Sequence, residues 1–438
     1  MKKFITIIIL ILLALVGYIV YVEISRNKII PLTTEEEKVE INEYYIYGTT
    51  LNMKGSLNVE NLSYDKAELV LYNEELKLDK KESKEKRFTI IPMEYEQVEN
   101  TINFHISELI NDGLYLDNIE IGDYKIFIRT THKETIEDEE QITYKYYILD
   151  NKTEYKDTTY YTMSKYNRKI VINSENDYQT MMLNVTKNQD KLDVYDIVID
   201  PGHGGIDPGA VIKGEKESEH TLAISLKLEE KLKKAGLKVR LTRYEDTLTE
   251  KDYFDEYGTG GRAQISHEVY PKYLISIHLN KNTSSKVRGI ELYTPANINY
   301  DFAKDLVEQV VNNSSIEYSN MKMFKMFNGV YTHNFTKSEI ESSNTQAEEK
   351  GYTPYDITTN SSYLYMIRET GGIMTGAYVD DRNEKQTGND YYNSNIGSEA
   401  YLLELSYLSN KQDLTIIKEE QDKYIEAIAN SIIKNFDK

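Results

Sequence analysis

The hydrophobic pattern of the chain begins with one long apolar run. Residues 4–22 carry no charge, follow Lys2 and Lys3, and are numerous enough to cross a bilayer core of about 30 Å. The run has no Ala-x-Ala-like cleavage site, so we expect a single-pass transmembrane signal anchor rather than a cleaved signal peptide. Residues 1–3 would be a cytoplasmic tip, and the rest of the chain would lie outside the cell membrane.

The pattern then changes to short alternating runs. Residues 23–40 are polar and acidic, as in a linker. Residues 41–190 contain period-2 runs rich in Tyr, Ile, Val and Thr, separated by Asn, Asp and Gly. Many such strands without long helical stretches predict an all-β, sandwich-like domain. His105 and His132 are isolated in this region, and we interpret both as structural.

Beyond residue 194 strand-like and helix-like runs alternate. Strands are expected at 195–200, 238–243, 273–280, 287–294 and 400–410, and helices at 217–237, 299–313 and 421–436. This alternation predicts an α/β domain over 194–438, with three layers and a mostly parallel or mixed central sheet. The long polar segment 318–399 interrupts the pattern, and long loops of this kind are usually functional or disordered.

Composition narrows the chemistry. The formal charge of −20 argues against a nucleic-acid partner, since phosphate neutralisation needs an excess of cations. The chain has no cysteine, which excludes thiol catalysis and thiolate metal sites. Any metal must therefore be held by histidine and carboxylate side chains.

Three polar residues close or interrupt apolar strands. His203 follows the strand 195–200 within a Gly- and Pro-rich turn, and His278 closes the strand 273–280. Glu404 lies within the apolar run 400–410, where an unpaired carboxylate is costly. Alternatively, His278 is a core histidine whose ring nitrogens are hydrogen-bonded within the fold. The corresponding alternative for Glu404 is a buried salt bridge with an arginine such as Arg243 or Arg262.

Two histidines and a carboxylate at strand ends match an open zinc site with three protein ligands. The third ligand should be an acid near His203, and Glu217 at the start of the helix 217–237 is a candidate. Glu215 and Glu219 fit the spacing as well, and Glu217 could also simply complement the helix dipole.

The motifs around these residues resemble the zinc-dependent N-acetylmuramoyl-L-alanine amidases, the type-3 family of bacterial cell-wall hydrolases. The resemblance covers residue 196 to the C-terminus and rests on IVIDPGHGGIDPGA (197–210), TLA (221–223), LTR (241–243), SIHLN (276–280) and LLELSYLSN (402–410). It implies one Zn²⁺ held by His203, Glu217 and His278, with Glu404 as the catalytic carboxylate.

Several positions depart from the family pattern without touching an expected ligand. These positions are Leu279, Ser406, Tyr407 and His267. His220 is a weaker alternative ligand. The candidate substrate-binding residues are Arg262, Asn280, Arg382 and Asn395. Some relatives carry an occluding helix before the catalytic Glu, and residues 337–360 could be such a lid.

The expected function is hydrolysis of the amide between N-acetylmuramic acid and the L-alanine of the stem peptide in peptidoglycan. Glu404 would act as general base. The alternatives are a catalytically inactive wall-binding or partner-activating scaffold and a zinc amidase for another amide substrate. The β domain would be a spacer or a docking module, and an activating protein partner could bind it or the segment 318–399.

Overall fold

The computed structural model describes residues 39–436, except 74, 77–83, 108–112, 137–138, 151–157, 176–179, 247–260, 324, 352–353, 355–356 and 371–396. The expected anchor 4–22 and most of the linker lie outside the described residues. Within the described part of the chain, no helix combines the length and the apolar character needed to cross a membrane.

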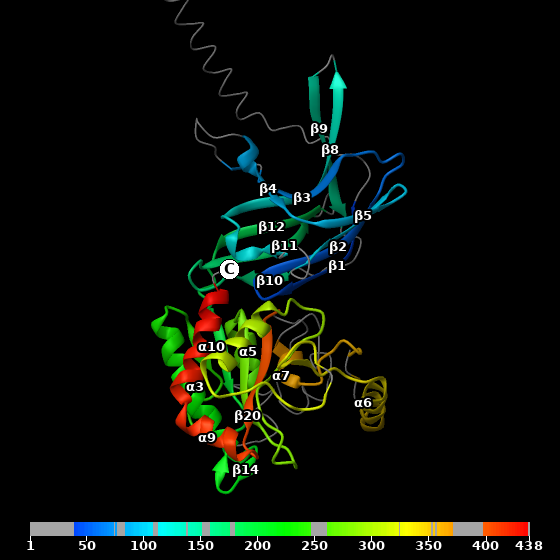
Figure 1. The fold of residues 1–438 in the computed structure, drawn as a ribbon. Helices are drawn as coiled ribbons and strands as arrows, with labels where there is room; N and C mark the ends of the chain where they lie inside the picture. The colour runs from blue at the N-terminus through cyan, green and yellow to red at the C-terminus, as the bar shows by residue number, and fades with distance from the viewer. Residues whose placement is uncertain are drawn as a thin grey trace, which may run out of the picture.

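The first part of the described chain is built from strands (Figure 1). They are β1 (Val39–Tyr47), β2 (Thr50–Asn58), β3 (Lys66–Tyr72), β4 (Phe88–Ile91), β5 (Glu94–Val98), β6 (Thr101–Ile106), β7 (Leu114–Tyr115), β8 (Gly122–Ile136), β9 (Glu139–Asp150), β10 (Thr158–Tyr161), β11 (Arg168–Glu175) and β12 (Thr180–Lys187). Burial alternates along β6 and over the first four residues of β1, as the period-2 pattern predicts, and the alternation in β1 ends near its register shift between Ile41 and Glu43.

These strands form one hydrogen-bonded network rather than two separate sheets. The order is β10-β11-β12-β8-β9-β1-β2-β6-β5, with β3, β4 and β7 attached to it. The long strand β8 explains the difference from a simple sandwich. Residues 122–125 of β8 pair with β12, and residues 125–131 pair with β3. The single strand β8 therefore connects the strands β10, β11 and β12 to the pair β3 and β4. Sequence alternation predicts the strands but not which strand continues from one group into the other.

The second part is a mixed α/β unit. Its sheet has the order β16-β13-β17-β20-β18-β19. The strands are β13 (Ile197–Pro201), β16 (Val239–Leu241), β17 (Tyr273–Asn280), β18 (Glu291–Thr294), β19 (Val330–Thr332) and β20 (Glu399–Tyr407), and β14 (Val211–Ile212) and β15 (Glu215–Lys216) form a small hairpin. The first four strands in this order are parallel, and β18 runs antiparallel to β20.

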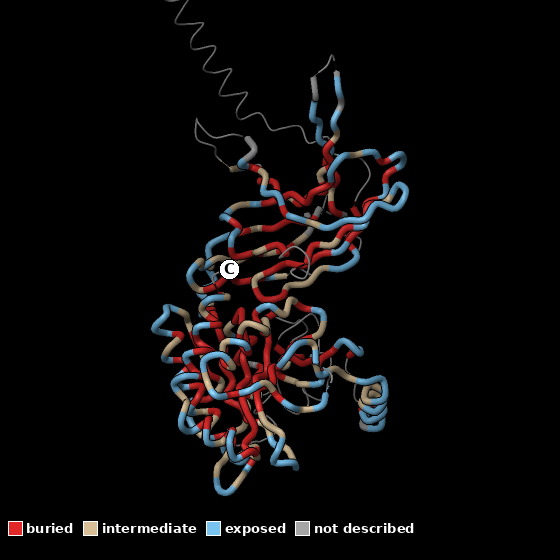
Figure 2. The backbone as a smooth tube through the Cα atoms, in the orientation of Figure 1, coloured by how far each residue is buried: buried red, intermediate tan, exposed pale blue. Residues whose placement is uncertain are grey.

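Helices cover both faces of this sheet and make the expected three layers. The helices are α3 (Glu217–Lys234), α4 (Arg262–Val269), α5 (Asp301–Asn313), α6 (Lys337–Lys350), α7 (Tyr365–Thr370), α9 (Lys411–Glu419) and α10 (Gln421–Phe436). Apolar residues of α3, α5 and α10 share one core with the sheet, and residues of α7 and α4 pack on the other face. Figure 2 shows the buried backbone concentrated along the strands and the inner sides of these helices.

The two parts meet at the sheet edge where β13, β17 and β20 begin. Asp196, just before β13, accepts hydrogen bonds from the backbone N and the hydroxyl of Ser164, at 2.8 and 2.9 Å. Lys272, just before β17, donates to the backbone oxygen of Tyr161. Because ligand sites in parallel sheets lie at the opposite, carboxyl ends of the strands, this contact leaves those ends uncovered.

The burial of Lys272 at this contact links the free energy of unfolding to pH. Burial lowers the pKa of Lys272 to about 8, although the charges of Asp117 and Asp196 oppose the shift. Between pH 8 and the usual value of 10.5, the unfolded chain binds one more proton at this position than the folded chain. The free energy of unfolding that Lys272 contributes therefore rises with pH across this window.

We expect the wild-type protein to gain about 3 kcal/mol of unfolding free energy relative to Lys272→Met as pH rises through that window, since one pKa unit corresponds to about 1.4 kcal/mol. Urea unfolding of both proteins at matched pH values measures the difference. A difference between the two proteins that does not change with pH would contradict the lowered pKa.

A candidate metal centre

His203 stands where the chain leaves β13. Its backbone has φ of 58°, a left-handed conformation that His adopts more readily than bulky residues do. A Cβ on the preceding Gly202 would lie 2.4 Å from Cε1 of His278, so only glycine leaves room for the His278 ring against this turn. The ring centroids of His203 and His278 are 4.9 Å apart, with an interplanar angle of 83°.

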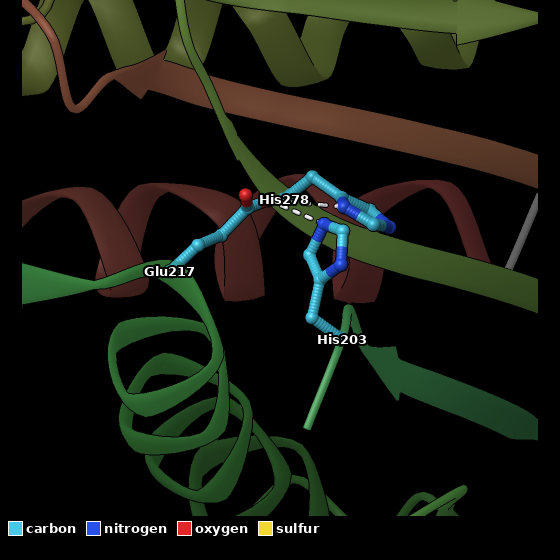
Figure 3. A group of neighbouring side chains, drawn as sticks. All are labelled: His203, Glu217 and His278. Carbon is cyan, nitrogen blue, oxygen red and sulfur yellow. Dashed lines mark hydrogen bonds and ion pairs between the residues drawn. The ribbon is translucent and has the colours of Figure 1, made fainter. Parts of the chain in front are cut away.

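Glu217, the first residue of α3, directs its carboxylate at both rings (Figure 3). Its Oε1 lies 3.2 Å from Nε2 of His203 and 3.1 Å from Nδ1 of His278. The backbone N of Leu279 donates to Oε1, and the backbone N of Ala210 donates to Oε2, each at 2.9 Å. These two donors from separate elements fix the carboxylate in the group.

The charges within the group shift its pKa values in opposite directions. Burial lowers the pKa of His203, but hydrogen bonds and charge from Glu217 and Asp207 outweigh burial and raise it to about 8. Burial raises the pKa of Glu217, but the two histidines outweigh it and hold that pKa far below the usual 4.5. The group is therefore arranged to place positive charge beside a buried carboxylate.

The three side chains fit a metal ion. Their ligand atoms all lie within 4.8 Å of one another, and no other such group occurs among the residues that the structure describes. Two imidazole nitrogens and one carboxylate oxygen form a donor set that catalytic zinc sites use with an open fourth position. The structure thus brings together the three residues expected as ligands.

Asp207 contacts the His203 ring, a contact that the sequence patterns did not predict. Its Oδ2 lies 2.6 Å from Nδ1 of His203, and its Oδ1 accepts from the backbone N of Gly209 at 3.1 Å. A carboxylate on Nδ1 leaves Nε2 directed at Glu217 and fixes the orientation of the ring. The turn that brings Asp207 back to the His203 ring has positive φ at His203, Gly204 and Gly205.

We expect Asp207→Asn to weaken divalent metal binding by about 10–100-fold, as loss of an outer-shell carboxylate usually does. Competition with a chromogenic chelator measures the affinity. Asp246→Asn is the control, because Asp246 accepts a hydrogen bond from the backbone of the same loop, at Gly205, and does not contact His203. Equal metal affinity of Asp207→Asn and the wild type would exclude the supporting role.

Glu404 lies beside the group on the next strand. It is the register partner of His278 in the β17–β20 pair, so both side chains emerge on the same face. Its Oε2 is buried and has no hydrogen-bond partner within the described part of the chain. Burial and the negative charges of Glu217 and Glu291 raise the pKa of Glu404 well above 4.5.

The two arginines considered as partners of Glu404 bind elsewhere. Arg243 donates to the backbone oxygens of Pro201 and Gly202, each at 3.0 Å. Arg262 forms an ion pair with the buried Asp200. Both guanidinium groups thus brace the turn after β13, and Glu404 is not explained as their salt-bridge partner. The expected contact of Arg262 with substrate stays a prediction.

The neighbouring acids and the remaining histidine alternative lie outside the group. Glu215 pairs with Lys418 at 2.7 Å and with His220 at 2.9 Å, and Glu219 pairs with Lys216 at 2.9 Å. The structure thereby separates Glu217 from both acids, which spacing alone left open.

Among the substrate-binding candidates, Asn280 is held at both ends of its amide. Its Nδ2 donates to Glu291 at 3.1 Å, and its Oδ1 accepts from the backbone N of Lys281 at 2.7 Å. Arg382 and Asn395 lie outside the described residues.

The lid candidate 337–360 contains the expected acidic helix, α6. A capping box of Thr336 and Glu339 begins the helix, and Gly351 ends it with φ of 69°. Figure 1 shows α6 standing out at the side of the mixed α/β unit, beyond α7. A lid role for this segment stays a prediction.

The three clustered residues lie in the part of the chain that matches a known protein family. The sequence model described as N-acetylmuramoyl-L-alanine amidase matches residues 197–434. The N-acetylmuramoyl-L-alanine amidase AmiA of Escherichia coli is 35% identical over 102 residues, which are 23% of this chain and 32% of AmiA. A Buchnera aphidicola protein named for the same activity is 25% identical over 249 residues, 49% of this chain and 98% of its own length.

The match to AmiA thus spans about a third of the length of that relative. Among solved structures, the amidase AmiC2 of Nostoc punctiforme aligns with 56% of this chain and 98% of its own, at 21% identity and a TM-score of 0.36.

Proposed function

The chain belongs to the N-acetylmuramoyl-L-alanine amidase family, and we propose that it hydrolyses the amide between N-acetylmuramic acid and the L-alanine of the peptidoglycan stem peptide. One observation carries the proposal. Glu404, whose buried Oε2 has no hydrogen-bond partner among the described residues, lies next to the group of His203, Glu217 and His278, within the matched residues. A metal-binding group beside a free acid–base residue suits metal-assisted hydrolysis.

We propose that the group holds one zinc ion. The donor set supports zinc, which accepts imidazole and carboxylate ligands readily. When bound, zinc supplies Lewis-acid polarisation of the scissile carbonyl and lowers the pKa of water to about 7. Asp207 holds the His203 ring so that Nε2 is available for the ion.

Glu404 carries the proton transfers in this proposal. Its carboxylate accepts a proton from the attacking water as the water oxygen bonds to the lactyl carbonyl carbon. The same carboxyl then gives the proton to the L-alanine nitrogen as the C–N bond breaks. The products are a lactyl carboxylate on the sugar and a stem peptide with a free amino terminus. No described residue donates a hydrogen bond to the buried Oε2 of Glu404, so the protein itself does not engage this oxygen.

Two other functions make different predictions. A non-catalytic scaffold would bind peptidoglycan without turnover, and a zinc amidase for another substrate would bind zinc and leave peptidoglycan intact. Metal analysis of the full-length protein, with turnover of an N-acetylmuramoyl peptide and of an unrelated N-acyl amino acid, separates the three. We expect one zinc per chain and hydrolysis of the muramoyl substrate. Hydrolysis of the unrelated amide alone would overturn the peptidoglycan assignment.

We further propose that residues 4–22 anchor the protein in the cell membrane with the amidase outside. The uncharged apolar run supports this, and externally added protease should digest the protein in intact spheroplasts. The β-rich part contacts the sheet edge opposite the metal-binding group, which supports a spacer or docking role. An activating protein partner would bind there or at 318–399.

A further inference from the structure

Glu291 is a buried carboxylate next to the proposed catalytic residue, and the mechanism above does not use it. It begins β18, and its residue surface is 1% exposed. In the β18–β20 pair it is the register partner of Glu404. Because Glu404 is in turn the partner of His278, the three side chains form one row across the sheet. Carboxylates directly opposite each other repel, so stability alone does not favour this arrangement.

The two carboxyl groups of the row differ in their hydrogen bonds. Glu291 accepts from the hydroxyl of Tyr407 at 2.5 Å and that of Ser319 at 2.6 Å on Oε1. Its Oε2 accepts from the hydroxyl of Tyr293 at 2.9 Å and from Nδ2 of Asn280 at 3.1 Å. Four donors thus satisfy one buried carboxylate, as burial of such a group requires.

Glu404 has the opposite environment. Its buried Oε2 has no donor within the described part of the chain, although four donors surround its neighbour in the row. An unpaired buried acceptor costs roughly 1–3 kcal/mol, so its persistence needs a reason. The hydroxyl hydrogens of Tyr407 and Ser319 rotate about their C–O bonds, so without Glu291 as acceptor they are free to point elsewhere.

We infer that Glu291 is a positioning residue, which binds the surrounding donors and so leaves the Glu404 carboxyl free to contact the reacting water. This inference rests on the proposed amidase function. Among the described residues, the hydrogen bonds of Glu291 go to Asn280, Tyr293, Ser319 and Tyr407 and to none of the three proposed metal ligands. Its role is to keep the hydroxyls of Tyr407 and Ser319 from donating a hydrogen bond to the Glu404 carboxyl.

The test replaces Glu291 by glutamine in the full-length protein. The amide of Glu291→Gln has one acceptor oxygen and two donor hydrogens, so it releases hydroxyls and adds a donor beside Glu404. We expect kcat on peptidoglycan to fall by on the order of ten- to a hundredfold, with KM and zinc content unchanged. Asp196→Asn is the matched control, because Asp196 is also a buried carboxylate bonded by several donors, but at the opposite sheet edge.

A second substitution separates positioning from a structural role. Tyr407→Phe removes a hydroxyl that Glu291→Gln releases, so the double variant should recover several-fold in kcat over the single variant Glu291→Gln. If Glu291 only stabilises the fold, the double variant would be less active than either single variant.

Three results would overturn the inference. They are a kcat of Glu291→Gln within about twofold of the wild type, a kcat of the double variant below that of Glu291→Gln, and a loss of kcat in Asp196→Asn equal to that in Glu291→Gln. In each case the wild-type protein still cleaves peptidoglycan, and the proposed function stands. A wild-type protein that binds zinc but does not cleave peptidoglycan would instead remove the proposed function, and the inference with it.

Discussion

Glu404→Gln is expected to lower amide hydrolysis by about 10²–10⁴-fold, the range that a general acid–base residue contributes, while zinc stays bound. The physical reason is that an amide cannot accept and return the proton, yet it keeps the size of the carboxyl group. Since Glu404 is not one of the three clustered ligand residues, metal content should match the wild type. Turnover of peptidoglycan and zinc per chain are measured on the same preparation.

Glu399→Gln is the matched control for this substitution. Glu399 lies on the same strand, β20, but at its other end, where the two parts of the chain meet. Burial raises the pKa of Glu399 to about 7, so an amide resembles its protonated form. This variant should retain near-normal turnover. Near-normal turnover of Glu404→Gln as well would remove Glu404 from the mechanism.

Glu217→Gln is expected to lower zinc affinity by more than about a hundredfold, because loss of an outer-shell partner alone costs 10–100-fold. Glu217 is the only carboxylate of the clustered group in the described part of the chain, and its oxygen faces both histidines. Activity should fall in proportion to bound metal. Added zinc should restore part of it, which distinguishes weakened binding from a damaged catalytic residue.

Two neighbouring glutamates provide the controls. Glu215→Gln and Glu219→Gln change the same residue type within two positions, but Glu215 pairs with Lys418 and His220, and Glu219 pairs with Lys216. Both variants should bind zinc as the wild type does. If Glu215→Gln lost zinc and Glu217→Gln kept it, the assignment of the third ligand would be wrong.

The sequence predicted the parts of the site that lie on regular elements. His203 and His278 were expected at strand ends, and Glu404 within an apolar strand, because polar residues interrupt an otherwise regular pattern there. The helices at 217–237, 299–313 and 421–436 appear as α3, α5 and α10, since their apolar spacing follows the helical period.

The sequence did not predict contacts that depend on turns and strand pairing. Asp207 reaches His203 through a tight turn with positive φ at His203, Gly204 and Gly205, and the importance of Gly202 depends on where the His278 ring lies. Glu291 is adjacent to Glu404 only through the antiparallel pairing of β18 with β20. Periodicity identifies a strand but leaves its neighbour and register open.

Product analysis of a peptidoglycan digest tests the central claim most directly. Purified sacculi are incubated with the full-length protein in detergent, with Glu404→Gln as the blank, and the soluble products are identified by mass spectrometry. We expect stem peptides with free N-terminal L-alanine, together with glycan strands whose muramic acid carries a free lactyl carboxylate. Muropeptides that keep the muramoyl–alanine amide but are cut in the glycan or within the peptide would contradict the account.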